Sequence, residues 1–188
     1  MMSTAYDWGD CLPTLLGTQV ELRALSKTDV PALFEIFSDH RVMRYWSTPA
    51  MHDASQAERY FESIQEGFRS QQLFQWGIQV GEDLAGTCTL FHLDLVHRRA
   101  EIGYALGYRF WGKGLAQDAV TAVIRFAFET LDLHRMEADV DPRNARSLRL
   151  LQKLGFREEG WLRERYMVNG ETQDALLLGL LRPEWKRQ

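Results

Sequence analysis

The alternation of apolar and polar residues divides this chain into strand-like and helix-like segments. A period of two predicts half-buried strands, whereas apolar residues spaced three and four apart predict one buried helix face. The first strand-like segment is TQVELRAL, in which Val20, Leu22 and Ala24 would point inward. Further segments of this kind are LFQWGIQV, LAGTCTLFHL, RAEIGYALGY, RMEADV, FREEGWLRERYMV and ETQDALLLGLL. The pattern therefore predicts about seven strands.

Helical spacing predicts about four helices between these strands. They are an early helix with Val30, Leu33, Phe34 and Phe37 on one face, a second from about residue 54 to 70, a third from Gly114 to about Leu131, and a fourth that Asn144 caps and Gly155 ends. The order is strand, two helices, three strands, helix, strand, helix and two strands. It predicts a mixed α/β (α+β) domain around one central, mostly antiparallel sheet.

Length and composition fit a single globular domain. A chain of 188 residues, 45% apolar and 26% charged, can bury a core without disulfides or metal. We expect a flexible leader over residues 1–17 and the domain over residues 18–188. The start MMSTAYDWGD is acidic where a signal peptide is basic, and no apolar run approaches the length of a membrane span. With only Cys11 and Cys88 as thiols, the protein is expected in the cytoplasm, without membrane association.

Charge narrows the classes of partner. The net charge is −4, and basic residues are dispersed among acidic ones, so nucleic acid is not an expected partner. A cationic substrate would be a more natural ligand. The five histidines show no metal-ligand spacing, and no metal is predicted.

A glycine-rich stretch, GYRFWGKGLAQDA, starts at Gly107 before the third predicted helix. Its spacing resembles the loop G-x-x-x-x-G-K-[ST] of nucleoside triphosphatases, but Gly114 stands where the Mg²⁺-binding hydroxyl belongs. A dinucleotide-binding fingerprint fails because Gln117 occupies its third glycine position. Backbone amides near Gly112 and Lys113 would still bind phosphate oxygens at a helix start without metal. The alternative is an ordinary strand-to-helix turn.

The same stretch resembles the GNAT superfamily of acetyl-CoA-dependent N-acetyltransferases. RFWGKGLA matches that family's pyrophosphate-loop pattern [QR]-x-x-G-x-[GA], with Arg109, Gly112 and Gly114 in the defining places. RRAEIGYAL resembles the preceding strand, DPRNARSLRLLQKLGF the Asn-x-x-Ser helix, and REEGWLRERYMVNGETQDALLLGLLRPEW the closing strands. HRVMRYWSTP and AERYFESI resemble the branch that contains ribosomal-protein N-terminal acetyltransferases. The resemblance runs from about Thr18 to Trp185.

This resemblance implies the GNAT fold, acetyl-CoA as donor, and direct, sequential transfer to a primary amine. The acceptor would be a protein N-terminus or a small-molecule amine, and the protein a monomer or homodimer. It also implies a strand that splays from its neighbour and offers amides to the pantetheine arm. The implied cofactor-binding residues are Tyr104, Ala105, Leu106, Arg109, Gly112, Lys113, Gly114, Leu115, Ala116 and Asn144.

Acetyl transfer also needs a base, because an alkyl amine is mostly protonated at pH 7. Glu101 is the candidate, and its alternative role is a structural ion pair. The arginines considered for that pair are Arg98, Arg99 and Arg135. Ser147 is the candidate that helps the thiolate leave, since the resemblance places this serine near the cofactor sulfur. Its alternative role is to satisfy the free backbone amides at the helix start. Tyr104 or Tyr166 can also serve as the acid.

Cys88 offers a second mechanism, in which a thiol carries the acetyl group before passing it on. His92 lies on the same predicted strand face, but that separation along a strand exceeds hydrogen-bonding reach, so Cys88 is expected in the core. In the family the connection between the first two helices borders the acceptor. Tyr45 and Trp46 are therefore expected to line the acceptor pocket, whereas Trp76, in a predicted strand, is expected in the core.

A different functional class remains as the alternative to an enzyme. A catalytically silent domain could bind acyl-CoA as a sensor or serve as an assembly module. The presence of both Glu101 and Ser147 favours the enzyme.

Overall fold

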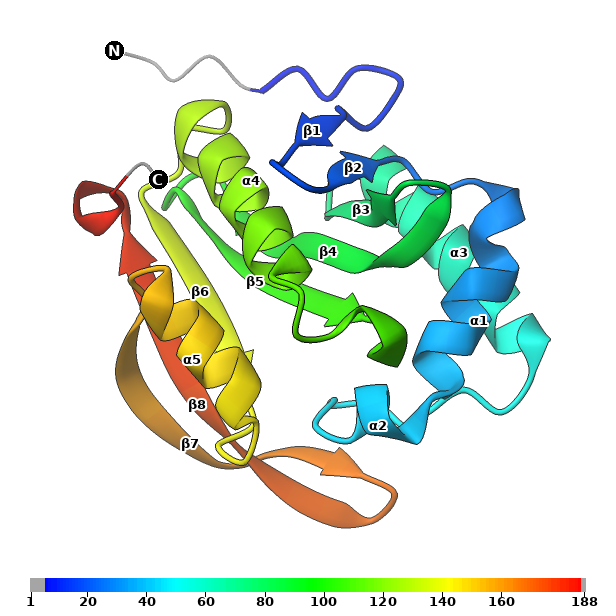
Figure 1. Cartoon of the computed structure of the whole chain (residues 1–188). Helices are drawn as coiled ribbons and strands as arrows, with labels where there is room; N and C mark the ends of the chain where they lie inside the picture. The colour runs from blue at the N-terminus through cyan, green and yellow to red at the C-terminus, as the bar shows by residue number, and fades with distance from the viewer. Residues whose placement is uncertain (1–5, 187–188) are drawn as a thin grey trace.

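Eight strands form one sheet in the order β1-β2-β3-β4-β5-β6-β8-β7 in the computed structural model, which describes residues 6–186 (Figure 1). The strands are β1 (Leu15–Leu16), β2 (Glu21–Arg23), β3 (Phe74–Val80), β4 (Asp83–Asp94), β5 (Arg99–Leu106), β6 (Arg135–Val140), β7 (Arg157–Val168) and β8 (Glu171–Leu181). Neighbouring strands are antiparallel except for β5 and β6, which are parallel. The predicted mixed, mostly antiparallel sheet is confirmed, with β1 as an additional strand.

Helices cover both faces of this sheet. They are α1 (Val30–Ser38), α2 (His40–Met43), α3 (Ala54–Arg69), α4 (Leu115–Glu129) and α5 (Ala145–Lys153), with the short 3-10 turns η1 (Lys27–Asp29), η2 (Tyr108–Phe110) and η3 (Arg182–Glu184). α4 and α5 lie in front of the sheet in Figure 1. Along β3, Phe74 and Trp76 contact Phe126 of α4, whereas the intervening Gln75 donates to the Tyr60 hydroxyl of α3. Because side chains alternate along a strand, α3 covers the opposite face from α4.

Part of the expected leader, residues 6–17, packs against the sheet, whereas its flexibility remains a prediction. Trp8 is buried and stacks on Phe74 with 4.2 Å between ring centroids. The Pro13 carbonyl accepts a hydrogen bond from the indole nitrogen of Trp76, and β1 follows. A tryptophan side chain buries a large apolar area, which helps to order the short segment around it. The alternation of apolar and polar residues does not predict this packing. Residues 1–5 lie outside the described part of the chain.

β5 and β6 diverge in the middle of the sheet (Figure 1). Their ladder pairs Arg99 with Arg135 and ends where Glu101 pairs with Glu137, whereas β5 continues to Leu106. The splayed strand that the family resemblance implied is therefore confirmed. We call the divergence of β5 and β6 beyond Glu101 the strand opening, and it positions the candidate site.

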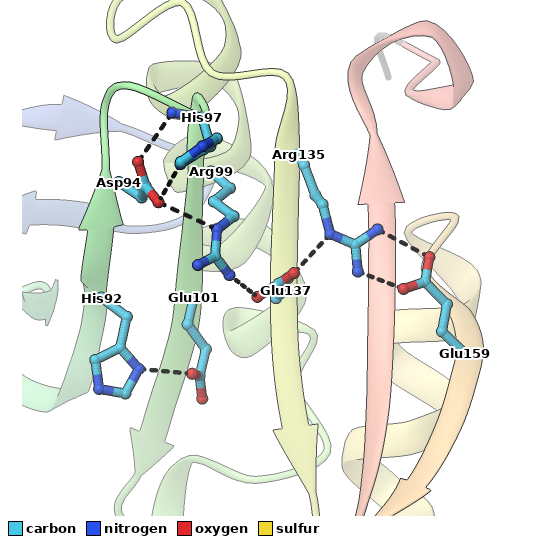
Figure 2. A network of polar contacts seen from close by, with 8 residues as sticks. All are labelled: His92, Asp94, His97, Arg99, Glu101, Arg135, Glu137 and Glu159. Carbon is cyan, nitrogen blue, oxygen red and sulfur yellow. Dashed lines mark hydrogen bonds and ion pairs between the residues drawn. The ribbon is translucent and has the colours of Figure 1, made fainter.

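Ion pairs join side chains from four strands, β4, β5, β6 and β7, at the closed end of the strand opening (Figure 2). Asp94 of β4 contacts Arg99 of β5, whose guanidinium lies 3.4 Å from Glu137 of β6. Arg135 of β6 contacts Glu137 at 2.6 Å and also pairs with Glu159 of β7. This ion-pair ladder joins the strands on both sides of the point where β5 and β6 separate.

Candidate active site

Two glycines in left-handed conformations shape the loop that leads into α4. Gly112 has φ +75°, and Gly114, the N-cap of α4, has φ +78°. Glycine adopts this region without steric cost. α4 begins at Leu115, and its first intrahelical hydrogen bond comes from the amide of Asp118, so the earlier amides point out of the helix. A phosphate-sized anion could accept hydrogen bonds from these amides, and its binding there remains a prediction.

The charged residues of this loop lie at the surface. Lys113 is exposed, and Arg109 of η2 pairs with Asp83 at 3.1 Å, both side chains being more than half exposed. Surface pairs of this kind are weak, so Arg109 remains free to turn toward an incoming phosphate. Ala116 is half-buried and Leu115 is buried, which leaves only their backbone amides available for an anion.

An N-terminal strap holds the first turn of α4, and we use this name for residues 17–20. The Asp118 carboxylate accepts hydrogen bonds from the amides of Thr18, Gln19 and Val20 at 2.8, 2.6 and 3.1 Å. A Cβ on Gly17 would lie 2.5 Å from an Asp118 oxygen, so only glycine permits this approach. Sequence spacing cannot reveal this contact, because its partners stand about a hundred positions apart.

Trp111 and Arg146 join the loop before α4 to α5. The Trp111 indole nitrogen donates to the carbonyl of Leu106 at 2.8 Å, where β5 ends. The guanidinium of Arg146 lies 4.7 Å from the centre of the Trp111 ring, a distance suited to a cation–π contact. Neither residue was predicted for the site, and no motif signal marks them.

Tyr104 and Ser147 meet where β5 faces the start of α5. Their hydroxyl oxygens lie 2.6 Å apart. Asn144 caps α5 as expected, since its side-chain oxygen accepts from the amide of Ser147 at 3.2 Å. Burial raises the pKa of Tyr104, because a phenolate would lose its hydration, and the bond to Ser147 opposes this only in part. The structure therefore brings together two side chains that were considered separately as the acid.

Glu101 contacts a histidine and not an arginine. Its Oε2 lies 2.9 Å from Nδ1 of His92, and its side chain is only 13% exposed (Figure 2). Burial raises the pKa of Glu101, and the nearby carboxylates of Asp139 and Glu137 raise it further, while His92 lowers it. The carboxyl of Glu101 therefore loses its proton at a higher pH than that of an exposed glutamate.

The predicted alternative of a Glu101–arginine ion pair is wrong in this structure. Arg98 pairs with Asp132, while Arg99 and Arg135 belong to the ion-pair ladder (Figure 2). The reason is that these guanidiniums meet other carboxylates: Arg99 reaches Glu137 on β6, whereas Arg135 contacts Glu137 on its own strand and Glu159 on β7, beyond β8.

Glu101 and Tyr104 lie on opposite faces of β5. Tyr104 packs against the core beneath α4 and α5, whereas Ala105 packs against the other core, with α1 and α3. Alternation puts Glu101 on the Ala105 face. Asp139 of β6 lies on the Glu101 face too, and it accepts a hydrogen bond from the Tyr166 hydroxyl at 2.9 Å. Burial raises the pKa of Tyr166 to about 12.

Cys88 lies in the core, as predicted. It is fully buried, and burial raises the pKa of its thiol, which disfavours the thiolate that a covalent route requires. Across residues 6–186, no group of three or more metal-ligating side chains comes together. Within the same residues, no helix is long and apolar enough to span a bilayer.

Tyr45 and Trp46 follow α2 and are both half-buried. Trp46 packs edge to face on Phe37 with 5.5 Å between ring centroids, so part of its ring belongs to the core beneath α1. Their role in an acceptor pocket remains a prediction. Trp76 is fully buried, as expected.

Comparison with known proteins identifies close relatives. Residues 19–157 match the family model described as Acetyltransferase (GNAT) domain. The chain is 35% identical to an uncharacterised N-acetyltransferase, p20, of Bacillus licheniformis, over 93% of this chain and 99% of that protein. It is 34% identical to a putative ribosomal N-acetyltransferase, YdaF, of Bacillus subtilis, over 89% of this chain and 93% of that protein.

Other relatives carry named activities or bound ligands. A spermidine N(1)-acetyltransferase of Escherichia coli is 28% identical over 88% of each chain. The structure of Mycobacterium smegmatis RimJ in complex with CoA-disulfide superposes with a TM-score of 0.84 at 26% identity, over 96% of this chain and 91% of that one.

Proposed function

Because the chain belongs to the GNAT family of acetyltransferases and is an acetyl-CoA-dependent N-acetyltransferase, we propose that it moves the acetyl group directly to a primary amine in a sequential mechanism. One observation carries this proposal. The strand opening is flanked by a buried carboxyl, Glu101, on one face of β5 and by the Tyr104–Ser147 hydroxyl pair on the other. A base and an acid at one opening suit amine acetylation.

The loop before α4 is the proposed site for the pyrophosphate of the donor. The left-handed Gly112 and Gly114 leave the first amides of α4 free, and Lys113 adds positive charge. We expect the pantetheine arm to run from this loop to the hydroxyl pair along Asn144 and the β5 backbone from Tyr104 to Leu106, which extends beyond the pairing with β6. This arrangement would bind the donor through its phosphates, which the reaction leaves unchanged.

The transfer forms one bond and breaks another. The neutral amine nitrogen attacks the thioester carbonyl, a C–N bond forms, and the C–S bond breaks to release the thiolate. Glu101 accepts the proton of the amine, directly or through water, and its raised pKa makes it a stronger base than an exposed carboxylate. Tyr104 or Ser147 supplies the proton that the thiolate takes up, and the second proton that the nitrogen loses as the amide forms restores that hydroxyl.

The charge on the Glu101 face supports a cationic acceptor. Glu137 pairs with Arg99 and Arg135, and Asp139 pairs with Arg165. Glu101 contacts His92 and none of these arginines, so its carboxylate is the one to which a protonated amine would be drawn. Both a protein N-terminus and a small polyamine carry such a charge. The names of the relatives include both kinds of acceptor.

An acetyl-CoA turnover screen that measures thiol release tests this proposal. Acceptors would be protein N-terminal peptides, polyamines, amino acids and aminoglycosides, with Glu101→Gln as the impaired control. We expect turnover with one class. If acetyl-CoA binds but no class turns over, the direct-transfer proposal is contradicted and a silent acyl-CoA-binding sensor or assembly module takes its place. The cytoplasmic location remains a prediction.

A further inference from the structure

We propose that His92 is a positioning residue that relays protons between Glu101 and solvent. This inference rests on the proposed role of Glu101 as the base. A base inside the strand opening must lose its proton before each new turnover, and a largely buried carboxyl exchanges protons slowly unless a polar group connects it to water.

A β-bulge turns His92 toward Glu101. Phe91 of β4 pairs with Glu101 of β5, so an unbroken ladder would next pair His92 with Ala100. Ala100 is buried, and a histidine opposite it would point into the core beneath α4. Instead the register shifts after Phe91, and the next pair joins Asp94 to Arg99. The extra residue moves His92 to the Glu101 face, as bulges beside active sites commonly do.

The backbone of His92 supports a functional origin for this bulge. Its φ is +49°, in the left-handed region, which is unfavourable for a residue with a side chain. Glycine or asparagine would suit this backbone better. Residues in such conformations cluster at functional sites, where the surrounding structure holds them. The bulge and this backbone conformation together hold the imidazole beside Glu101.

The imidazole bridges the buried carboxyl and the surface. Nδ1 lies 2.9 Å from Glu101 Oε2, and the His92 side chain is 74% exposed, compared with 13% for Glu101. Nε2 lies on the far edge of the ring, away from Glu101 (Figure 2). The other titratable groups that act on Glu101 are Glu137 and Asp139 of β6 and Tyr166 of β7. Of the contacts described for residues 6–186, only that with His92 leads from Glu101 to a mostly exposed side chain.

The relay moves one proton per turnover from the acceptor amine to water. The acceptor amine gives its proton to the Glu101 carboxylate, and the carboxyl passes it to Nδ1 of the neutral imidazole. The resulting imidazolium releases the proton on Nε2 to water. The exposed ring then restores its starting tautomer by exchange with water, and Glu101 is ionised again.

His92→Ala tests the relay against a matched control. His97 is also 75% exposed and its Nδ1 also contacts a carboxylate, that of Asp94 at 2.8 Å, but it lies in the ion-pair ladder away from Glu101. We expect His92→Ala to lower the steady-state turnover rate about tenfold at neutral pH, where Glu101 must be deprotonated again in every cycle, and to leave acetyl-CoA affinity unchanged. Added imidazole should restore the rate in a concentration-dependent way, whereas His97→Ala should behave like wild type.

The outcomes separate the relay from the proposed base. If Glu101→Gln impairs transfer but His92→Ala keeps the wild-type rate and pH profile, only the relay is overturned. A loss in His92→Ala that imidazole does not restore also overturns it, because the histidine is then structural. If Glu101→Gln itself has no effect, the proposed function of Glu101 fails. His92→Gln, which keeps a hydrogen-bonding group, should fold like wild type and remain slow.

Discussion

The hydroxyl oxygens of Tyr104 and Ser147 lie 2.6 Å apart and connect β5 to the first turn of α5 beside the strand opening. Asn144 fixes one side of this contact by capping α5 through the Ser147 amide. Tyr104 is the other side of the contact, and its phenol is protonated at neutral pH because burial disfavours the phenolate and raises its pKa. A protonated phenol held by a second hydroxyl is suited to donate a proton to a leaving thiolate.

Tyr104→Phe should lower kcat by about 10- to 100-fold, since it removes the proton donor and little volume. Acetyl-CoA affinity, measured by titration calorimetry, should change far less than kcat. Ser147→Ala should also lower turnover more than affinity, by a smaller factor if Tyr104 is the donor. The reverse result for Ser147, weaker binding with normal turnover, would show it to be a structural residue of the helix start.

Glu101→Gln should depress turnover at neutral pH and recover in part at alkaline pH, where more of the acceptor amine is already neutral. In the wild type, the active form of Glu101 is ionised, so the rate should fall as the pH drops through its pKa. Because burial raises that pKa, the fall should begin at higher pH than for an exposed glutamate. A pH–rate profile of kcat/KM would show this limb in the wild type, and an unchanged profile in Glu101→Gln would exclude it as the base.

Gly114→Ala should weaken acetyl-CoA binding about 5- to 30-fold, because a side chain at φ +78° costs about 1–2 kcal/mol and the loop would relax away from its anion-binding form. Gly112→Ala should act similarly, since space surrounds its Cβ position and only the backbone is strained. Gly155→Ala is the matched control, with φ +98° at the far end of α5. Gly155→Ala should destabilise the fold without changing acetyl-CoA affinity. If all three variants bind acetyl-CoA as tightly as the wild type, the loop is not the phosphate site.

Asp118→Ala should lower the free energy of unfolding by about 1–3 kcal/mol, because three amides of the N-terminal strap lose a charged acceptor. Urea denaturation measures this loss. Asp118→Asn keeps one side-chain oxygen as an acceptor and should lose less. If the two variants are equally stable and match the wild type, the strap does not contribute to stability.

Cys88→Ala should retain wild-type turnover, because its thiol is buried and burial raises the pKa of that thiol. Initial-rate patterns provide a second test, since direct transfer gives intersecting lines and a covalent intermediate gives parallel ones. Loss of activity in a folded Cys88→Ala protein would revive the covalent route.

Local rules predicted much of the site, because caps and left-handed turns depend on a few neighbouring residues. The start of α4 after Gly114, the cap at Asn144 and the left-handed Gly155 all follow from such rules. The family resemblance added the splay of β5, which no periodicity indicates.

Contacts between distant segments escaped prediction. The partner of Glu101 depends on a bulge at His92, which appears only when β4 and β5 pair. The packing of Trp8 on Phe74 likewise depends on the folded sheet, as does the hold of Asp118 on the strap. Charge pairs were predicted by residue type, but strand register selected the carboxylate that each arginine meets.

The placement of Glu101 and Tyr104 on opposite faces of one strand makes sheet register part of the chemistry. A slip of β5 by a single residue would turn each to the other face, placing the carboxyl on the side of α4 and α5 and the phenol on the side that carries Glu137. It would also move Ala100 and Ile102 out of the core beneath α4, so the slip would cost stability as well as the ordered pair of proton acceptor and donor. The bulge and the ion-pair ladder thus hold β5 in the one register that gives the carboxyl and the phenol separate environments.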